Sequence, residues 1–181
     1  MFHTPPNLII YIYKHWQPLY SEIEKLLPNV SFQSNIPSEE ELKQMVSNRD
    51  HSLLICDDMM SEIGSSDFIR DVFTRLSHHL KVSTILLLQN ATAPGKYNST
   101  LCRNAHVSVL MKSPREAYTI RALGMQLGDY KNLLAAYRDA TQEPFSYLVC
   151  DTHPNAPPTY KYRTKIFPDD NDGVVTYINR Q

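Results

Sequence analysis

Two adjacent acids at the end of an apolar run are the sharpest chemical signal in the sequence. The run is Leu53-Leu-Ile-Cys56, and Asp57 and Asp58 follow it directly. A strand of this kind delivers both carboxylates to one edge of a sheet. One acid can hold Mg²⁺, which takes one or two carboxylates and keeps several waters. The other can polarise or deprotonate a water that attacks a phosphate. Acids at strand ends also cap following helices or turns, so the pair alone leaves both interpretations open.

Two amides, Gln89 and Asn90, end the next apolar run along the chain, which begins at Ser83. A side-chain amide can donate to a phosphate and accept from a water without adding charge. Next to the two acids, such a group could sense the γ-phosphate or the attacking water. An amide at a strand end also needs no special function.

The elements that must position these residues alternate between strands and helices. We expect strands at residues 8–13, 30–32, 51–57, 82–89, 107–111 and 145–150, and helices at residues 18–27, 38–48, 66–79, 113–128 and 130–141. Ser38-Glu-Glu-Glu41 is a capping-box pattern that marks a helix start, and Val82–Gln89 is apolar on both faces, as in a buried parallel strand. The alternation predicts an α/β three-layer sandwich with a mostly parallel sheet.

Domain organisation follows from a change in composition near residue 150. Residues 1–150 carry the expected strands and helices, and we expect one core domain there. Residues 151–181 are rich in proline and contain Asp169-Asp-Asn-Asp-Gly173, so we expect an extended C-terminal segment.

Bulk composition fits a globular protein of the cell interior. The 181 residues are 42% hydrophobic and 20% charged, with a net charge of -1, so no global field attracts nucleic acid or an anionic membrane. The apolar runs are far shorter than the ~20 residues of a membrane span. The cysteines, Cys56, Cys102 and Cys150, have no CxxC spacing, which favours a reducing compartment, nucleus or cytoplasm.

Two further clusters have weaker alternatives. His78 and His79 with Cys102 and His106 could be imagined as a metal site, but histidines at a helix end more often face its negative dipole end. The segment Tyr160-Lys-Tyr-Arg-Thr-Lys165 interleaves aromatic rings with cations, as binders of single-stranded nucleic acid do. A solvated edge segment is the preferred interpretation there.

From Leu8 to Pro168 the sequence resembles the packaging ATPases of double-stranded DNA viruses and virus-like transposons, notably Polinton/Maverick elements and their adintovirus relatives, in the FtsK/HerA group of P-loop NTPases. Several blocks in one order carry the resemblance. They are Trp16-Gln-Pro-Leu-Tyr20, His51-Ser-Leu-Leu-Ile-Cys-Asp-Asp58, Val72-Phe-Thr-Arg-Leu-Ser-His-His79, Leu88-Gln-Asn90, Asn104-Ala-His106, Lys112-Ser-Pro-Arg115 and Arg163-Thr-Lys-Ile-Phe-Pro168.

The resemblance implies a role for each candidate residue. The two acids become a Walker B motif, with Asp57 holding Mg²⁺ and Asp58 as the catalytic acid, while Gln89 or Asn90 becomes the γ-phosphate sensor. Arg103 and Arg115 are candidate arginine fingers, which would complete a neighbouring subunit's site in a ring. Arg70 and Arg75 lie on an expected helix and are more simply solvated.

One departure from the family is large. These enzymes carry a GxxxxGK[ST] loop that cradles the β- and γ-phosphates, and the 181 residues contain none. The one Gly-Lys pair, Gly95-Lys96, lacks the following Ser or Thr and a glycine five residues earlier. The resemblance implies that the first strand of the family sheet, next to the sensor strand, is absent too. A truncated sequence and a decayed or domesticated copy both fit.

The resemblance implies a DNA-packaging ATPase that uses Mg²⁺ and ATP. In full-length form it would translocate double-stranded DNA into a capsid as a homo-oligomeric ring, inside the cell or associated with the virion, without a membrane. This chain is expected to bind ATP weakly or not at all and not to turn it over. The alternatives are a non-enzymatic module for oligomerisation or for DNA or capsid binding, and an unrelated α/β domain that uses the acids to hold Mg²⁺ in phosphoryl transfer.

Overall fold

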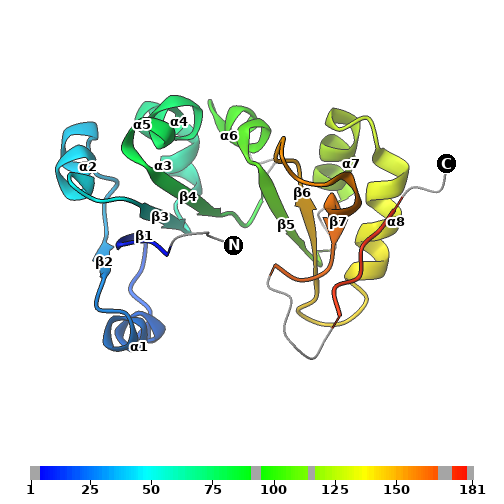
Figure 1. Ribbon diagram of the computed structural model, residues 1–181, viewed down its shortest axis with the longest axis horizontal. Coiled ribbons are helices and arrows are strands. Elements are labelled where there is room, and N and C mark those ends of the chain that lie inside the picture. The colour runs from blue at the N-terminus through cyan, green and yellow to red at the C-terminus, as the bar shows by residue number, and fades with distance from the viewer. Residues whose placement is uncertain (1–4, 91–94, 114–116, 167–172, 179–181) are drawn as a thin grey trace. The chain divides into compact units, whose positions relative to one another are not determined.

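The computed structural model describes residues 5–90, 95–113, 117–166 and 173–178. The chain forms two compact units, which meet between Asn104 and Ala105. Figure 1 draws both with their helices and strands labelled. Each unit has its own sheet and its own core, so each is described by itself.

The first unit is built on a four-stranded, all-parallel sheet. Its strands are β1 (Leu8–Tyr13), β2 (Val30–Gln33), β3 (Ser52–Asp57) and β4 (Val82–Leu87), in the order β2-β1-β3-β4. The central strands pair without a bulge from Leu8↔Ser52 to Tyr13↔Asp57 and from Ser52↔Val82 to Asp57↔Leu87. All three therefore end at the same level on one edge of the sheet.

Helices connect these strands by crossovers. They are α1 (Pro18–Leu26), α2 (Glu39–Val46), α3 (Met60–Ser65), α4 (Asp67–Asp71), the π-helical turn η1 (Val72–Leu76) and α5 (Ser77–Leu80). A further helix, α6 (Asn98–Asn104), follows β4. The expected capping box is present, because Ser38 accepts from the Glu41 amide and Glu41 accepts from the Ser38 amide. The helix expected at residues 66–79 begins at Asp67, with Ser66 as its N-cap and η1 in its middle.

The alternation of side chains along the strands divides the sheet into two faces. Ile10, Ile12, Leu54 and Cys56 are fully buried in the larger core cluster, which α2 to α6 complete. Tyr20 of α1 instead packs against aromatic rings that point to the opposite face. Figure 1 shows α1 on the other side of this sheet from α2, α3, α4 and α5. The α/β class with helices on both faces of a parallel sheet is thus confirmed for this unit.

The second unit is an antiparallel sheet covered by two helices. Its strands are β5 (Val107–Met111), β6 (Tyr147–Asp151) and β7 (Tyr162–Arg163), its helices are α7 (Ala117–Gln126) and α8 (Tyr130–Ala140), and η2 (Pro158–Tyr160) is a 3₁₀ turn. Ile120 and Leu133 from the helices meet Leu148 and Tyr162 from the sheet in a separate core. The expectation of one mostly parallel sheet was therefore wrong for β5 and β6.

The two sheets differ in the end at which the chain returns. The connection between β3 and β4 contains α3, α4, η1 and α5 and brings the chain back to the end where β3 began, so these strands are parallel. After α7 and α8, by contrast, the chain returns at the end where β5 finishes, and Met111 pairs with Tyr147 in an antiparallel ladder.

The structural boundary also differs from the expected division at residue 150. Residues beyond Asp151 belong to the second unit, where Tyr162 is 2% exposed and Tyr177 packs on the same core. Asp169 and its neighbours, Ala93-Pro94 and Pro114 lie outside the described residues. Among the described residues, no helix is both long and apolar enough to cross a membrane.

We predict that Leu54→Ala lowers the free energy of unfolding of the first unit by about 2–5 kcal/mol, because it leaves a cavity at a fully buried site. The same substitution at Leu26, which is 78% exposed on α1, should change it by less than about 0.5 kcal/mol. Urea unfolding followed by circular dichroism compares the two variants. Equal losses would contradict the assignment of the core.

Candidate functional site

The two acids lie at the carboxyl edge of the parallel sheet. Asp57 is the last residue of β3, and Asp58 follows it with a φ of 54°, in the left-handed region. Aspartate visits this region more readily than most residues because its short side chain can bond locally. The turn separates the two carboxylates: Asp57 is half-buried and Asp58 is exposed.

Two tyrosines hold Asp57 in place. The hydroxyls of Tyr11 and Tyr20 donate to Asp57 Oδ2 at 2.8 Å and 2.9 Å. Both bonds use the same oxygen, so neither tyrosine occupies Asp57 Oδ1. Burial, and then the hydrogen bond to Asp57, raise the pKa of both tyrosines. The two hydroxyls therefore remain protonated donors through the ordinary pH range.

An aromatic cluster fixes these tyrosines in turn. It consists of five rings from β1, β2, α1 and the segment between β1 and α1: Tyr11, Tyr13, Trp16, Tyr20 and Phe32. Tyr20 stacks on Phe32 with centroids 5.1 Å apart, and Trp16 meets Tyr20 edge to face at 5.5 Å. Offset and edge-to-face packing is the favourable geometry for such rings. The block Trp16–Tyr20 thus packs next to Asp57.

The second acid contacts the expected sensor. Gln89 Nε2 donates to Asp58 Oδ1 at 2.7 Å, although the residues are 31 positions apart in the sequence. Gln89 lies two residues beyond the end of β4, and the exposed Asn90 follows it. The structure therefore brings together Asp57, Asp58 and Gln89 at one edge of the sheet.

A lysine at the same edge was missed by the sequence analysis. Lys14 is the first residue after β1, and its ammonium group donates to Glu62 of α3. Because Tyr13 and Asp57 are partners in the ladder, Lys14 and Asp58 leave the sheet at the same level. Lys14 directly follows the apolar run of residues 8–13, as Asp57 follows its own run, and this position is the signal that could have identified it. Tyr11 and Tyr20 were likewise not expected as partners of Asp57.

The carboxylates fit the ligand preference of Mg²⁺. Its usual protein sites supply one or two carboxylates and leave the remaining positions to water and phosphate. Asp57, with Oδ1 not used by the tyrosines, and the exposed Asp58 meet that demand. In the described part of the chain, no three or more His, Cys, Asp and Glu side chains gather as a metal-binding group. His78 and His79 lie in the last turn of α5.

The candidate arginines that the structure describes lie on helices of the first unit. Arg103 is exposed near the end of α6, and Arg115 lies outside the described residues. Arg70 pairs with Asp67 and Asp71 at 2.7 Å and 2.6 Å. Arg75 also pairs with Asp71, at 2.9 Å. Arg70 and Arg75 thus serve a local ion-pair network in the first unit.

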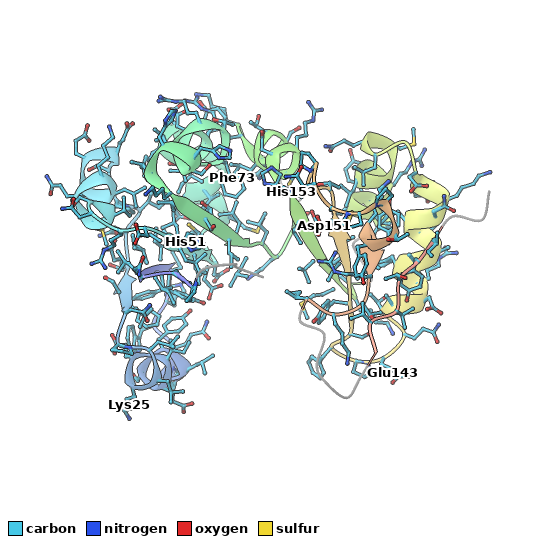
Figure 2. All side chains as sticks on the ribbon, in the orientation of Figure 1. Lys25, His51, Phe73, Glu143, Asp151 and His153 are labelled. Atoms are coloured by element: carbon cyan, nitrogen blue, oxygen red, sulfur yellow. The ribbon has the colours of Figure 1, made fainter. Side chains whose placement is uncertain are left out.

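The basic and aromatic segment at residues 160–165 has structural partners. Lys161 pairs with Asp129 at 3.2 Å, and Arg163 pairs with Asp151, labelled in Figure 2, at 3.0 Å. Tyr162, between them, is buried in the second core. The expected edge position is confirmed, because β7 is the edge strand of its sheet, but the segment is not solvated, because Tyr162 is buried and Lys161 and Arg163 are paired.

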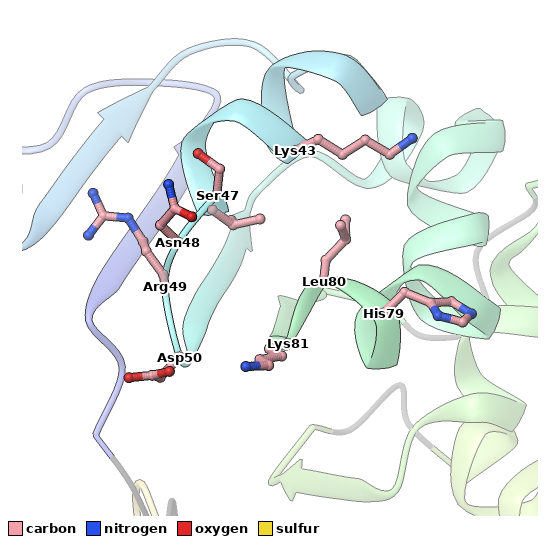
Figure 3. Close-up of a pocket in the computed structure, with 9 residues that line it drawn as sticks. Lys43, Ser47, Asn48, Arg49, Asp50, His79, Leu80 and Lys81 are labelled. Carbon is pink, nitrogen blue, oxygen red and sulfur yellow. The ribbon is translucent and has the colours of Figure 1, made fainter.

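A pocket of about 480 Å³ lies at the opposite edge of the parallel sheet, next to the amino ends of β3 and β4 (Figure 3). Lys43, Arg49, His79 and Lys81 contribute cationic or titratable groups to its lining, with Asp50 as the acid. Figure 3 shows Arg49 pointing to one side, and Lys43 and His79 to the other. The charged groups of this pocket do not converge on one ligand position.

The outer edge of β4 is open. Among the residues that the structure describes, β4 pairs with β3 and with no other strand, and Leu87 is 43% exposed. Its sequence, Val82-Ser-Thr-Ile-Leu-Leu87, has none of the charges or prolines that commonly protect an edge.

Comparison of the chain with protein-family models, with curated proteins and with solved structures finds no match in any of the three.

We predict that Tyr11→Phe makes the free energy of unfolding less sensitive to alkaline pH. The folded protein keeps the Tyr11 proton at a pH where the unfolded chain has lost it, because burial and Asp57 raise the pKa of Tyr11. The stabilisation is complete below the ordinary tyrosine pKa of about 10 and is lost as pH rises above it. The measurement is urea unfolding of both proteins between about pH 9 and 11.5.

The slope should become shallower in the variant without vanishing, because the pKa values of Tyr20, Tyr162 and Tyr177 are raised as well. Parallel pH profiles for the two proteins would contradict the burial of the Tyr11 hydroxyl against Asp57.

Proposed function

We propose that this chain carries the Walker B half of an ATPase of the DNA-packaging type, a half-site for Mg²⁺ and the γ-phosphate of ATP. The hydrogen bond of 2.7 Å between Gln89 and Asp58 carries the proposal. It joins the two residues for which the resemblance implies the roles of sensor and catalytic acid. Their roles require contact with one water molecule, and this contact puts them within reach of one.

Each residue of the half-site has a definite task. Asp57 holds Mg²⁺ through Oδ1, directly or through the water shell, while Tyr11 and Tyr20 fix its other oxygen. Asp58 polarises the attacking water, and Gln89 or Asn90 contacts the γ-phosphate. A Mg²⁺ held by Asp57 would supply positive charge against the charge that develops on the phosphate during transfer.

The half-site lacks the main phosphate-binding device of the family. No GxxxxGK[ST] loop occurs in the 181 residues. The open edge of β4, beside Gln89, is where the resemblance puts the strand that leads into such a loop. Catalysis of phosphoryl transfer rests on positioning and on charge neutralisation. The chain by itself should therefore bind ATP weakly and turn none over.

The partners follow from the same proposal. In the full-length form, a homo-oligomeric ring would move double-stranded DNA into a capsid, with Arg103 or Arg115 reaching a neighbouring subunit's nucleotide. The protein would work in the nucleus or cytoplasm or within a virion.

A second candidate is a non-enzymatic module for oligomerisation or for binding DNA or capsid. The apolar side chains around α1 favour it, since Trp16 is 47%, Leu19 55% and Leu26 78% exposed. Trp16 lies just before α1 and the two leucines lie on it, and a contiguous apolar patch on a surface commonly marks a protein interface. This module would need neither Mg²⁺ nor ATP, which separates the two candidates experimentally.

We predict weak, Mg²⁺-dependent binding of a fluorescent ATP analogue, with a dissociation constant in the upper micromolar to millimolar range (of order 4–6 kcal/mol of binding free energy). Asp57→Asn should weaken it at least tenfold, because the amide cannot replace a carboxylate as a Mg²⁺ ligand. Fluorescence polarisation, with and without Mg²⁺, measures both.

Asp50→Asn is the matched control, because Asp50 is an exposed aspartate at the other edge of the sheet, in the pocket of Figure 3. It should bind like the wild type. Absence of binding at millimolar analogue, or equal losses in both variants, would refute the half-site and favour the interaction module.

A further inference from the structure

The strand order identifies a second position at the carboxyl edge where a ligand can enter. From β1 the chain crosses to β2 on one side, and from β2 it returns past β1 to β3 and then β4. The direction therefore reverses between β1 and β3. In open parallel sheets, ligands bind outside the carboxyl ends of the strands at such a switch point. Lys14 follows β1 there, and Asp57 and Asp58 lie at the end of β3.

The Lys14 side chain connects the two sides of the switch point between β1 and β3. Its partner Glu62 belongs to α3, the element that follows Asp58, so the ion pair joins the end of β1 to the chain that leaves β3. The hydrogen bond from Lys14 is the first cause that lowers the pKa of Glu62. Glu62 thus stays ionised at neutral pH and holds the Lys14 side chain against α3, at the carboxyl edge of the sheet.

The ion pair can open at little cost. The side chain of Lys14 is 45% exposed and that of Glu62 is 31% exposed. Exposed ion pairs contribute little to stability, because water screens them and ordering two long side chains costs entropy. A bound polyphosphate offers Lys14 several anionic oxygens, and Lys is a common point-charge ligand for phosphate. Exchange of Glu62 for phosphate therefore costs little.

We propose that Lys14 forms a phosphate subsite at the β1/β3 switch point, where it binds the triphosphate of a Mg²⁺–nucleotide whose metal is held by Asp57. The inference rests on the proposed half-site and extends it. The 181 residues contain no GxxxxGK[ST] loop, and the subsite would supply a cation for the phosphates in its place. Lys14 follows β1, which lies on the other side of β3 from β4. Its ligand class is the Mg²⁺ complex of a nucleoside triphosphate or of inorganic triphosphate.

Trp16 reports on this position. It is the single tryptophan of the chain, lies two residues beyond Lys14, and packs on Tyr13 and Tyr20. Because Trp16 is 47% exposed, a ligand at Lys14 should change its fluorescence. Calorimetry of the same samples gives the affinity without depending on that signal.

The test titrates the full chain with Mg²⁺–triphosphate and with Mg²⁺–ATP, by calorimetry and by Trp16 fluorescence. Lys14→Gln should weaken both ligands at least tenfold and abolish the fluorescence change, while Lys14→Arg should stay within about threefold of wild type because it keeps the charge. Lys25→Gln removes an equal charge from the last turn of α1 (Figure 2) and should bind like the wild type.

The outcomes separate this inference from the proposed function. Binding that depends on Asp57 but is unchanged in Lys14→Gln overturns the subsite and leaves the half-site standing. Binding of Mg²⁺–triphosphate that depends on Lys14 but not on Asp57 supports the subsite and overturns the half-site. No binding of either ligand overturns both, and equal losses in Lys14→Gln and Lys25→Gln overturn the subsite in favour of a general charge effect.

Discussion

The candidate site depends on the in-register parallel pairing of β1, β3 and β4. Each strand is six residues long, and the ladders run without a bulge, so Tyr13, Asp57 and Leu87 end level with one another. Buried backbone groups must be paired, which makes the register costly to change. A slip by one residue would turn Ile10 and Leu54 out of the core. The same constraint that buries the core therefore fixes the level at which Lys14, Asp58 and Gln89 leave the sheet.

The alternation of side chains explains how a half-buried carboxylate is stable there. Even-numbered residues of β1 and β3 enter the larger core, while Tyr11 and Asp57 point to the face that α1 covers. Burying a carboxylate is unfavourable unless hydrogen bonds compensate for its lost water. The hydroxyls of Tyr11 and Tyr20 supply two such bonds, and the rings around them supply apolar contact. Asp57 is thus held both by hydrogen bonds and by the packing around the two tyrosines. Asp58, by contrast, is exposed and accepts a hydrogen bond from Gln89.

Local patterns predicted much of this fold. The apolar runs located all the longer strands, the capping box at Ser38 located α2, and Asp58 and Gln89, both identified as polar residues that follow apolar runs, are in contact. The tyrosine contacts with Asp57 could not be predicted, because they depend on how α1 crosses the sheet. The second sheet was wrongly expected to be parallel, because the alternation of strands and helices does not show at which end of β5 the chain returns. The division at Asn104 follows from where two cores form, which the alternation of elements does not reveal.

The central claim is that the carboxyl edge of the parallel sheet binds a divalent metal with a triphosphate. The most direct test replaces Mg²⁺ with paramagnetic Mn²⁺, in the presence of ATP, and follows the backbone amide signals of the assigned chain by NMR. A metal bound at this edge should selectively broaden the signals of residues 14–16, 57–58 and 89–90, which flank the ends of β1, β3 and β4. Broadening confined to the pocket around Ser47 and Lys81, at the other edge of the sheet, or no selective broadening at all, would contradict it.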